Sequence, residues 1–399
     1  MPLRSQLQRM VGRDPAEAER SGSSLEVFYD LVFVVAFSVA SAQLAHFVAD
    51  GHYFTAIIAY TLTTFAAIWA WINFAWFASA FDTDDWLFRL LVLIQMVGVA
   101  IIAIGIPPAF ASIDAGEHPA TTVLVIGYMV MRVGMVTQWV RAGIESPTYR
   151  RTCFTYAGVT LVAQVGWVLV ALVPLNLRDT LIAAAVCVAI EWAGPLYAET
   201  RVLSTPWNSS HIAERYSTLT VITLGEGVVG TVALLQAMVG RNGWSVHTIV
   251  LGLAAMGVTF AMWWLYFLMP NGETLWKRRE RSFVFGYGSI PVLMACAAVG
   301  AGLHVVALWI EQEVRISNVA VVASLAVPVG VFSLGVVAMN SYLMRGDAPI
   351  RWRWPVAAAA LPLVAGLILA AAGAPVLVCA VVICLTPVLP VIVVEAVSD

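Results

Sequence analysis

Residues 25–48 read LEVFYDLVFVVAFSVASAQLAHFV, an apolar run with two carboxylates close to its start. A helix needs about 20 predominantly apolar residues to cross the hydrocarbon core of a bilayer, and this run is long enough. A cleaved secretory signal has a shorter apolar core and a small-residue cleavage site. We therefore predict a transmembrane helix that stays in the membrane.

Eleven further runs of spanning length follow this one. They cover residues 53–80, 86–106, 120–141, 152–173, 178–196, 211–239, 245–269, 283–308, 316–343, 354–373 and 375–395. The composition agrees, because 61% of the residues are hydrophobic and only 11% are charged, whereas about 25% charged residues is typical of soluble proteins. We predict an all-α integral membrane protein with about twelve transmembrane helices, in which any function lies in or between the helices.

The same composition argues against several classes of protein. The basic residues lie in short segments between the apolar runs, so the chain has no basic stripe for nucleic acid. The five cysteines lie inside apolar runs without a CxxC pair, which indicates neither a zinc site nor a redox pair. The histidines at positions 46, 118, 247 and 304 are scattered along the chain. We therefore predict no metal site and no cofactor.

One acidic connection could suggest an enzyme. Asp82 and Asp84 form an Asp-x-Asp pair at a membrane edge, which could hold Mg²⁺ on a lipid-linked sugar phosphate. Membrane transferases of that kind carry large loops on the opposite side of the membrane. The favoured interpretation is that these acids, with Asp85, cap the helix that begins at Trp86. We expect no catalytic residues and no enzyme.

Arginine and lysine are distributed unevenly among the connections. Fifteen of them lie in the N-terminal segment and in every second connection, and only three lie in the other connections. Cytoplasmic connections carry an excess of basic residues in multi-pass membrane proteins. Both termini are therefore predicted to be cytoplasmic, with residues 1–24 as an N-terminal segment and residues 197–210 as a central cytoplasmic connection.

The two halves of the chain show a weak internal similarity. An offset of 188 aligns Glu26 with Glu214, and an offset of 192 aligns Arg89 with Arg281. Because each half has six predicted spans, the two copies would run in the same direction through the membrane. We predict two parallel six-helix repeats, over residues 25–196 and 211–395.

Charged residues inside the predicted spans need a partner or a function, because a charge near the bilayer centre costs at least ~2.5 kcal/mol. Glu26 and Asp30 stand four residues apart and share one face of the first helix. His211, Glu214 and Arg215 open the seventh helix, and Glu226 lies deeper in it. The other interior candidates are Arg89, Arg132, Glu191 and Gly225.

The charged residues deepest in the predicted spans are expected to form ion pairs with one another. Arg132 and Glu226 are equally buried by sequence, so we expect them to pair or to share water, with Arg89 and Arg215 as the other basic partners. Gly225 and the following glycines would allow close helix approach or local unwinding beside Glu226. Two interpretations of the acids stay open: structural ion pairs, or a path for protons or cations.

Two motifs carry a resemblance to a known family. The run Leu25-Glu26-Val27-Phe28-Tyr29-Asp30-Leu31-Val32-Phe33-Val34 resembles the opening signature of the bacterial low temperature requirement protein A family, usually written E-L-F-F-D-L-V-F-V. The segment that begins with His211, Glu214, Arg215 and Tyr216 and reaches Gly225-Glu226 is similar to that family's H-x-x-E-R-[FY]…I-x-L-G-E. Val27 and Gly227 depart from the usual Leu and Ser. The resemblance implies a multi-pass membrane protein that is named for growth in the cold, and it implies no reaction.

The leading functional hypothesis is a carrier or ion-translocating protein of the bacterial cytoplasmic membrane. Glu26, Asp30, Glu214 and Glu226 would bind a proton or a cation, and Arg132 would compensate their charge. Its partners would be the lipid bilayer and a proton, a cation or a small molecule. The alternative is a membrane-stress or lipid-interaction scaffold in which the same charges form structural ion pairs. A transferase that uses Asp82 and Asp84 is the weakest of the three hypotheses.

Overall fold

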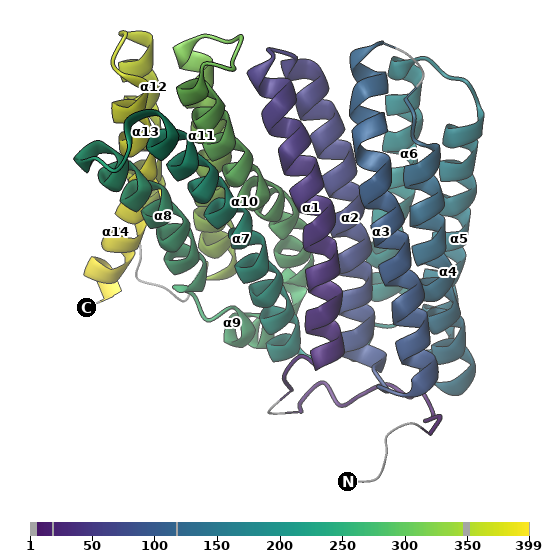
Figure 1. The fold of residues 1–399 in the computed structure, drawn as a ribbon. Coiled ribbons are helices and arrows are strands. Elements are labelled where there is room, and N and C mark those ends of the chain that lie inside the picture. The colour runs from purple at the N-terminus through teal and green to yellow at the C-terminus, as the bar shows by residue number, and fades with distance from the viewer. Residues whose placement is uncertain (1–5, 18–19, 117–118, 346–351, 399) are drawn as a thin grey trace. The chain divides into compact units, whose positions relative to one another are not determined.

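The computed structural model describes residues 6–17, 20–116, 119–345 and 352–398, and these residues form helices and connections (Figure 1). The helices are α1 (Ser24–Ala49), α2 (Tyr53–Phe81), α3 (Trp86–Asp114), α4 (Thr122–Glu145), α5 (Arg150–Leu172), α6 (Leu177–Tyr197), α7 (Ser209–Asn242), α8 (Val246–Phe267), α9 (Asn271–Lys277), α10 (Ser282–Glu311), α11 (Asn318–Leu343), α12 (Arg353–Ala371), α13 (Val376–Cys384) and α14 (Val388–Ser398). A π-helical segment (Ala198–Val202) extends α6, and a 3-10 turn (Arg279–Arg281) precedes α10.

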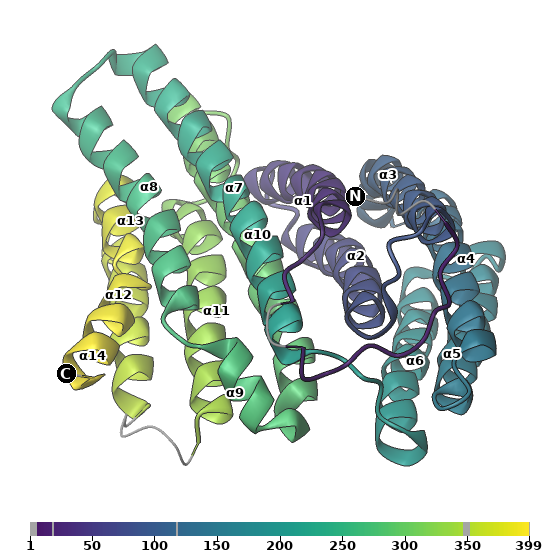
Figure 2. The same ribbon diagram turned by 90° about the horizontal axis from the view of Figure 1, so that it is seen from below.

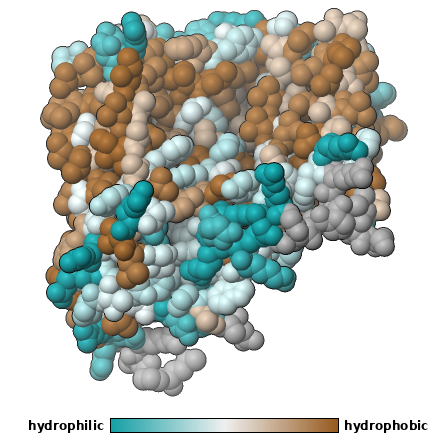
Figure 3. Space-filling view, turned by 180° about the vertical axis from the view of Figure 1, so that it is seen from behind, coloured by the Kyte–Doolittle hydropathy of each residue, from teal (hydrophilic) through white to brown (hydrophobic). Residues whose placement is uncertain are grey.

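Twelve helical segments of the described chain are long and apolar enough to cross a membrane, as the sequence predicts. Each begins within four residues of its predicted start. In a bilayer the backbone polar groups have to bond within the segment, and a helix satisfies them. Figure 3 shows the result on one face, where apolar side chains cover much of the surface and hydrophilic side chains gather below them.

The structure differs from the prediction in two places, within the last span and directly after the eighth. The predicted last span consists of α13 and α14, which are separated by a turn at residues 385–387 that ends with Pro387. Proline cannot donate a backbone hydrogen bond, which favours an interruption of the helix at this position. The short helix α9 follows the predicted eighth span. The arrangement in two parallel repeats stays a prediction. Three residues used in the sequence analysis lie outside the described residues: Arg4, His118 and Arg351.

The chain divides into two compact units. The first comprises residues 1–39 and 62–216, and the second comprises residues 40–61 and 217–399. Helices α1, α2 and α7 therefore each contribute residues to both units.

In the first unit, α3 to α6 pack in chain order, each against the next. Helices α3 and α4 approach closely at Gly98 and Gly127, where a Cβ on Gly127 would lie 2.7 Å from the carbonyl oxygen of Gly98. Small residues allow this kind of backbone approach between membrane helices. Polar side chains also join the helices: the Tyr29 hydroxyl donates to Gln95 (3.1 Å), and the Gln95 amide donates to Gln138 (2.9 Å).

The N-terminal segment crosses one end of this unit, as the view from below shows (Figure 2). The Arg13 backbone N–H donates to the carbonyl of Ala80 at the end of α2 (3.0 Å). The Asn208 amide, just before α7, donates to the carbonyls of Pro15 (3.1 Å) and Glu17 (2.9 Å). These bonds hold the beginnings of α1 and α7 at the same end of the unit.

In the second unit the core lies between α10, α11 and α13. Val299, Leu325 and Ile383 belong to one buried apolar cluster that these helices share with α7 and α8. Helices that are apolar on all sides suit this environment, because both the core and the surrounding lipid are hydrocarbon.

Labelling from the two sides of the membrane tests the predicted orientation. Ala115 follows α3, Thr148 precedes α5, and both are exposed. In intact cells, a membrane-impermeant maleimide should label Ala115→Cys from outside and Thr148→Cys only after the cells are opened, since basic connections stay in the cytoplasm. The native cysteines are buried and should give little background. Labelling of both positions from the same side would contradict the twelve-helix topology.

Candidate functional site

Four ionisable side chains from α1 and α7 meet in the first unit. Glu26 and Asp30 are one helical turn apart in α1, and His211 and Arg215 are one turn apart at the beginning of α7. All four are buried, with no more than 1% of each residue exposed. Both pairs have a spacing of four residues, so each pair lies on one face of its helix. Glu26 therefore contacts His211, and one turn further along Asp30 contacts Arg215.

The distances show direct ion pairing. Arg215 Nη2 lies 2.6 Å from Asp30 Oδ1, and Arg215 Nε lies 3.7 Å from Glu26 Oε1. His211 Nε2 lies 3.1 Å from Glu26 Oε1. Glu26 also stands in the first turn of α1, where the helix dipole favours negative charge. We call these four residues the α1–α7 charge cluster.

Aromatic residues enclose this cluster. The Trp71 indole N–H donates to Asp30 Oδ1 (2.6 Å), and the Arg215 guanidinium lies 5.7 Å from the ring centre of Trp71. Tyr216 packs edge-on against the same ring, with 4.9 Å between the centroids. Aromatic faces attract a desolvated guanidinium, so α2 supplies part of the stabilisation.

Backbone caps fix the beginnings of both helices. The Ser23 N–H donates to Glu26 Oε2 (2.7 Å), while the Glu26 N–H donates to Ser23 Oγ (3.3 Å). This reciprocal pair is a capping box, signalled in the sequence by Ser-x-x-Glu. The His211 N–H donates to the side-chain oxygen of Asn208 (2.9 Å). Glu26 therefore has a structural role besides its contact with His211.

Hydrogen bonding in the cluster is incomplete. Five of its buried polar atoms have no hydrogen-bond partner within the described chain: Glu26 Oε1, Asp30 Oδ2, His211 Nδ1, Arg215 Nε and Arg215 Nη1. An unsatisfied buried polar atom costs about 1–3 kcal/mol. The cluster can therefore accept a further hydrogen-bonding or charged ligand.

A second buried pair lies between α4 and α6. Arg132 Nη2 lies 3.5 Å from Glu191 Oε2, and the same carboxylate oxygen accepts the Tyr128 hydroxyl (2.6 Å). Arg132 also donates to that hydroxyl and lies over the Tyr128 ring. The predicted pairing of Arg132 with Glu226 is therefore replaced by a pairing with Glu191, one base with one acid.

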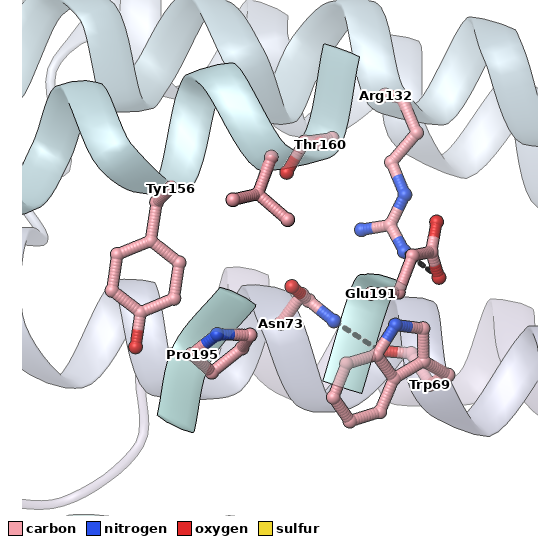
Figure 4. Close-up of a pocket in the computed structure, with 8 residues that line it drawn as sticks. Trp69, Asn73, Arg132, Tyr156, Thr160, Glu191 and Pro195 are labelled. Carbon is pink, nitrogen blue, oxygen red and sulfur yellow. Dashed lines mark hydrogen bonds and ion pairs between the residues drawn. The ribbon is translucent and has the colours of Figure 1, made fainter. Parts of the chain in front are cut away.

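A small cavity adjoins this pair. Figure 4 shows Arg132 and Glu191 on one side of it, with Asn73, Thr160 and Tyr156 around the rest. Its volume is about 10 Å³, roughly the space that one water molecule needs. A hydrated cation or a metabolite does not fit, so this site suits a structural role better than a passage.

The other predicted residues lie apart from both sites. Arg89 is at the exposed beginning of α3 and pairs with Asp84 (2.9 Å). Glu214 is exposed on α7, contrary to the expectation that it is buried. Glu226 is buried in the second unit, where it interacts electrostatically with Tyr60 and Cys296.

The glycines beside Glu226 act in packing. Helix α7 is continuous from Ser209 to Asn242, so the local unwinding that Gly225 suggested does not occur. Gly225 has open space around it, whereas Gly227 lies against Thr259 of α8. A Cβ on Gly230 would lie 2.7 Å from the carbonyl oxygen of Gly300 in α10. The close helix approach that was predicted for these glycines is therefore found at Gly227 and Gly230, and Gly225 takes no part in it.

Several residues of these sites were missed from the sequence. Tyr128 and Trp71 bond the buried charges, and a signal existed for Tyr128, which stands four residues before Arg132 on one helical face. Trp71 gave no such signal. His46 and His304, taken as scattered, lie with 5.7 Å between their ring centres in the second unit.

The connection between α2 and α3 is a structured turn. Asp85 caps α3 as predicted, accepting the Phe88 N–H (2.9 Å), and its other oxygen lies 2.6 Å from Arg141 Nη2. Burial opposes the charge of Asp85, but the Arg141 guanidinium and the N–H groups of Phe88 and Gln8 outweigh it and lower the pKa from its usual 3.8 to about 2. Among the described residues, no group of three or more His, Cys, Asp or Glu side chains is placed so that it could hold a metal ion.

These features define a multi-pass helical membrane protein with paired charges in its interior. Residues 21–386 match the family model described as bacterial low temperature requirement A protein (LtrA). The chain therefore belongs to the LtrA family. The two segments on which the sequence resemblance rested, in α1 and at the beginning of α7, contribute the residues of the α1–α7 charge cluster.

The chain is also similar to one curated protein. It is described as an uncharacterized protein of Rhizobium meliloti (strain 1021) and is 25% identical over 287 residues, which make up 67% of this chain and 65% of that protein. The chain thus spans slightly less than two thirds of that relative. No solved structure matches the chain.

The stability of the protein should depend on pH through Asp82, which interacts electrostatically with Glu26 of the charge cluster. Burial, followed by the negative charge of Glu26, raises the pKa of Asp82 from its usual 3.8 to about 6. The folded state then holds this proton more tightly than the unfolded state, so the contribution of Asp82 to stability is complete below pH 3.8 and is lost as the pH rises through about 6. Asp82→Asn should remove this loss. The melting temperature of the variant minus that of the parent should therefore rise as the pH is raised from about 4 to about 7.

The matched control has the opposite sign. Asp85→Asn should be less stable than the parent at neutral pH, because Arg141 loses its partner, and the deficit should shrink as the pH falls through 3.8 towards 2. Thermal unfolding of the purified protein over this range measures both effects. Identical pH profiles for the parent and Asp82→Asn would refute the raised pKa.

Proposed function

We propose that this LtrA family protein is a carrier that translocates a proton or another cation across the bacterial cytoplasmic membrane, with both termini in the cytoplasm. The α1–α7 charge cluster would be its ion-binding site. The observation that supports this proposal is the charge ratio of the cluster, two carboxylates to one guanidinium, in contrast to the one-to-one pair between α4 and α6.

The charge count favours an exchangeable cation. Glu26 and Asp30 share one guanidinium, that of Arg215, within direct contact. With His211 neutral, two carboxylates contact a single guanidinium, and a buried charge that lacks a contacting partner costs several kcal/mol. A proton on the His211 imidazole or a bound cation restores neutrality, and release of that ion returns the site to its previous state.

The geometry of the cluster also suits reversible binding. His211 has no hydrogen-bond partner at Nδ1 in the described chain, and Glu26 Oε1 is likewise without a hydrogen bond. A proton could be taken up at Nδ1 while Nε2 keeps its contact with Glu26, and a cation could use Glu26 Oε1. Imidazole is the side chain whose usual proton affinity allows a change of charge near physiological pH.

The alternative is a membrane scaffold with no transported ion. The capping box of Ser23 and Glu26 and the 2.6 Å pair of Arg215 and Asp30 favour it, since both are contacts that hold helix ends in register. In that case the cluster would serve only to join α1 to α7.

Reconstitution into proteoliposomes distinguishes the two functions. A pH-sensitive dye and a panel of cations under an imposed gradient should report ion flux for the parent protein. Glu26→Gln leaves Arg215 paired with Asp30, so it should fold normally while the flux falls at least about tenfold, which corresponds to an increase of roughly 1.4 kcal/mol in the effective barrier.

Glu214→Gln is the matched control, since Glu214 is exposed on the same turn of α7. It should keep the parental flux. Absence of flux for every cation with properly folded parent protein, or equal flux in parent and Glu26→Gln, would exclude the carrier role of this cluster and leave the scaffold.

A further inference from the structure

The second unit contains an apolar groove of about 500 Å³. Its walls are the end of α1, the beginning of α2, and the facing sides of α10 and α11. On α10 the small residues Ala295, Ala298 and Gly302 follow one another at helical spacing, and Ala320 and Ala323 do so on α11. Such short side chains leave the space between the helices open, and its size lies in the range of roughly 300–1,000 Å³ that is usual for small-molecule sites.

The groove opens sideways towards the surroundings of the helices. Ile57 and Val327 line it and are each 59% exposed. Because these helices span a membrane, the groove faces hydrocarbon rather than water. Unfilled space would forfeit dispersion contacts along its walls, so a hydrocarbon chain is the occupant that fits its chemistry.

The length of the groove fits one acyl chain. On α10 the lining residues run from Pro291 to Val305, and on α11 from Ala320 to Val331. At 1.5 Å per residue these stretches are about 21 Å and about 16 Å long. Half of the ~30 Å hydrocarbon core is about 15 Å. A chain that enters at the interface would therefore fill the groove to about the bilayer midplane.

Charges of both signs stand where the groove begins. The Arg315 N–H donates to the carbonyl of Ala49 (2.8 Å), directly after the groove residue Val48. Arg315 Nε lies 3.7 Å from Asp50 Oδ1, and their side chains are 79% and 51% exposed. An exposed pair of this kind is weak and exchangeable. It complements a head group that carries a phosphate and an ammonium group together.

We propose that this groove binds one acyl chain of a zwitterionic phospholipid, with the lipid phosphate on Arg315 and the lipid ammonium on Asp50. A purely anionic lipid would bring its phosphate close to the exposed acids Glu311 and Glu313 without an ammonium group to meet them. The site is independent of the α1–α7 charge cluster and of ion transport.

Native mass spectrometry of the full chain, with phosphatidylethanolamine or phosphatidylglycerol added at equal concentration, tests this site. The parent protein should retain phosphatidylethanolamine preferentially. Ala323→Leu fills the groove and should reduce that retention at least about tenfold. Ala357→Leu adds the same side chain at an exposed position of α12 and should retain the lipid like the parent.

A second variant keeps the test decisive if the groove variant folds poorly. Arg315→Gln changes an exposed side chain and should remove the preference for phosphatidylethanolamine over phosphatidylglycerol. Equal retention of both lipids by the parent, or unchanged retention in folded Ala323→Leu, would overturn the proposal. A protein dimer that Ala323→Leu abolishes, with no bound lipid, would overturn it in favour of a second copy of the chain.

Discussion

The contact between Arg215 and Asp30 is the interaction on which the arrangement of α1 and α7 depends. Both side chains are almost completely buried, and their charged atoms lie 2.6 Å apart. Removing one partner of such a pair leaves an uncompensated charge at a cost of about 3–5 kcal/mol. No apolar contact between two lipid-compatible helices supplies a comparable preference for one register, because lipid tails compete equally for apolar surface.

This constraint explains why the two family motifs are spaced as they are. Glu26 and Asp30 are four residues apart, as are His211 and Arg215. Each helix therefore places its two side chains one turn apart on one face, and the first residue of one pair meets the first of the other, as do the second residues. Trp71 and the capping box at Ser23 then fix the acids from the side of α2 and from the start of α1. The same contacts leave one carboxylate in excess, and this excess separates the cluster from the balanced Arg132 and Glu191 pair.

Much of the fold could be predicted because hydrocarbon thickness fixes the length of each span. Residues 53 and 86 were predicted starts and are the observed starts of α2 and α3. The break at Pro387 was missed, since residues 375–395 form one apolar run in the sequence and were predicted as one span. Buried acids of α1 and α7 could be recognised from their cost in the membrane.

Pairing between these acids and the basic residues could not be predicted in the same way. Arg132 and Glu226 are both deep in apolar runs, but burial by sequence does not give the direction in which a side chain points. Arg132 points instead to Glu191 of α6, a contact that only the tertiary structure defines. Glu214 shows the converse error: it is adjacent to Arg215 in the chain, but the next residue of a helix faces a direction about 100° away.

A double-mutant cycle between Arg215 and Asp30 tests the central claim most directly. The free energies of unfolding of Arg215→Gln, Asp30→Asn and the double variant would be measured in the same bilayer or micelle, with Arg89 and Asp84 as an exposed control pair. The account predicts that Arg215→Gln, which leaves both carboxylates without their guanidinium, costs about 3–5 kcal/mol, and that Asp30→Asn costs less because Glu26 still lies 3.7 Å from Arg215. The double variant should be more stable than the sum of the single effects by at least about 2 kcal/mol, against less than about 1 kcal/mol for the control pair. Additive effects within about 0.5 kcal/mol would show that the two residues do not hold α1 to α7.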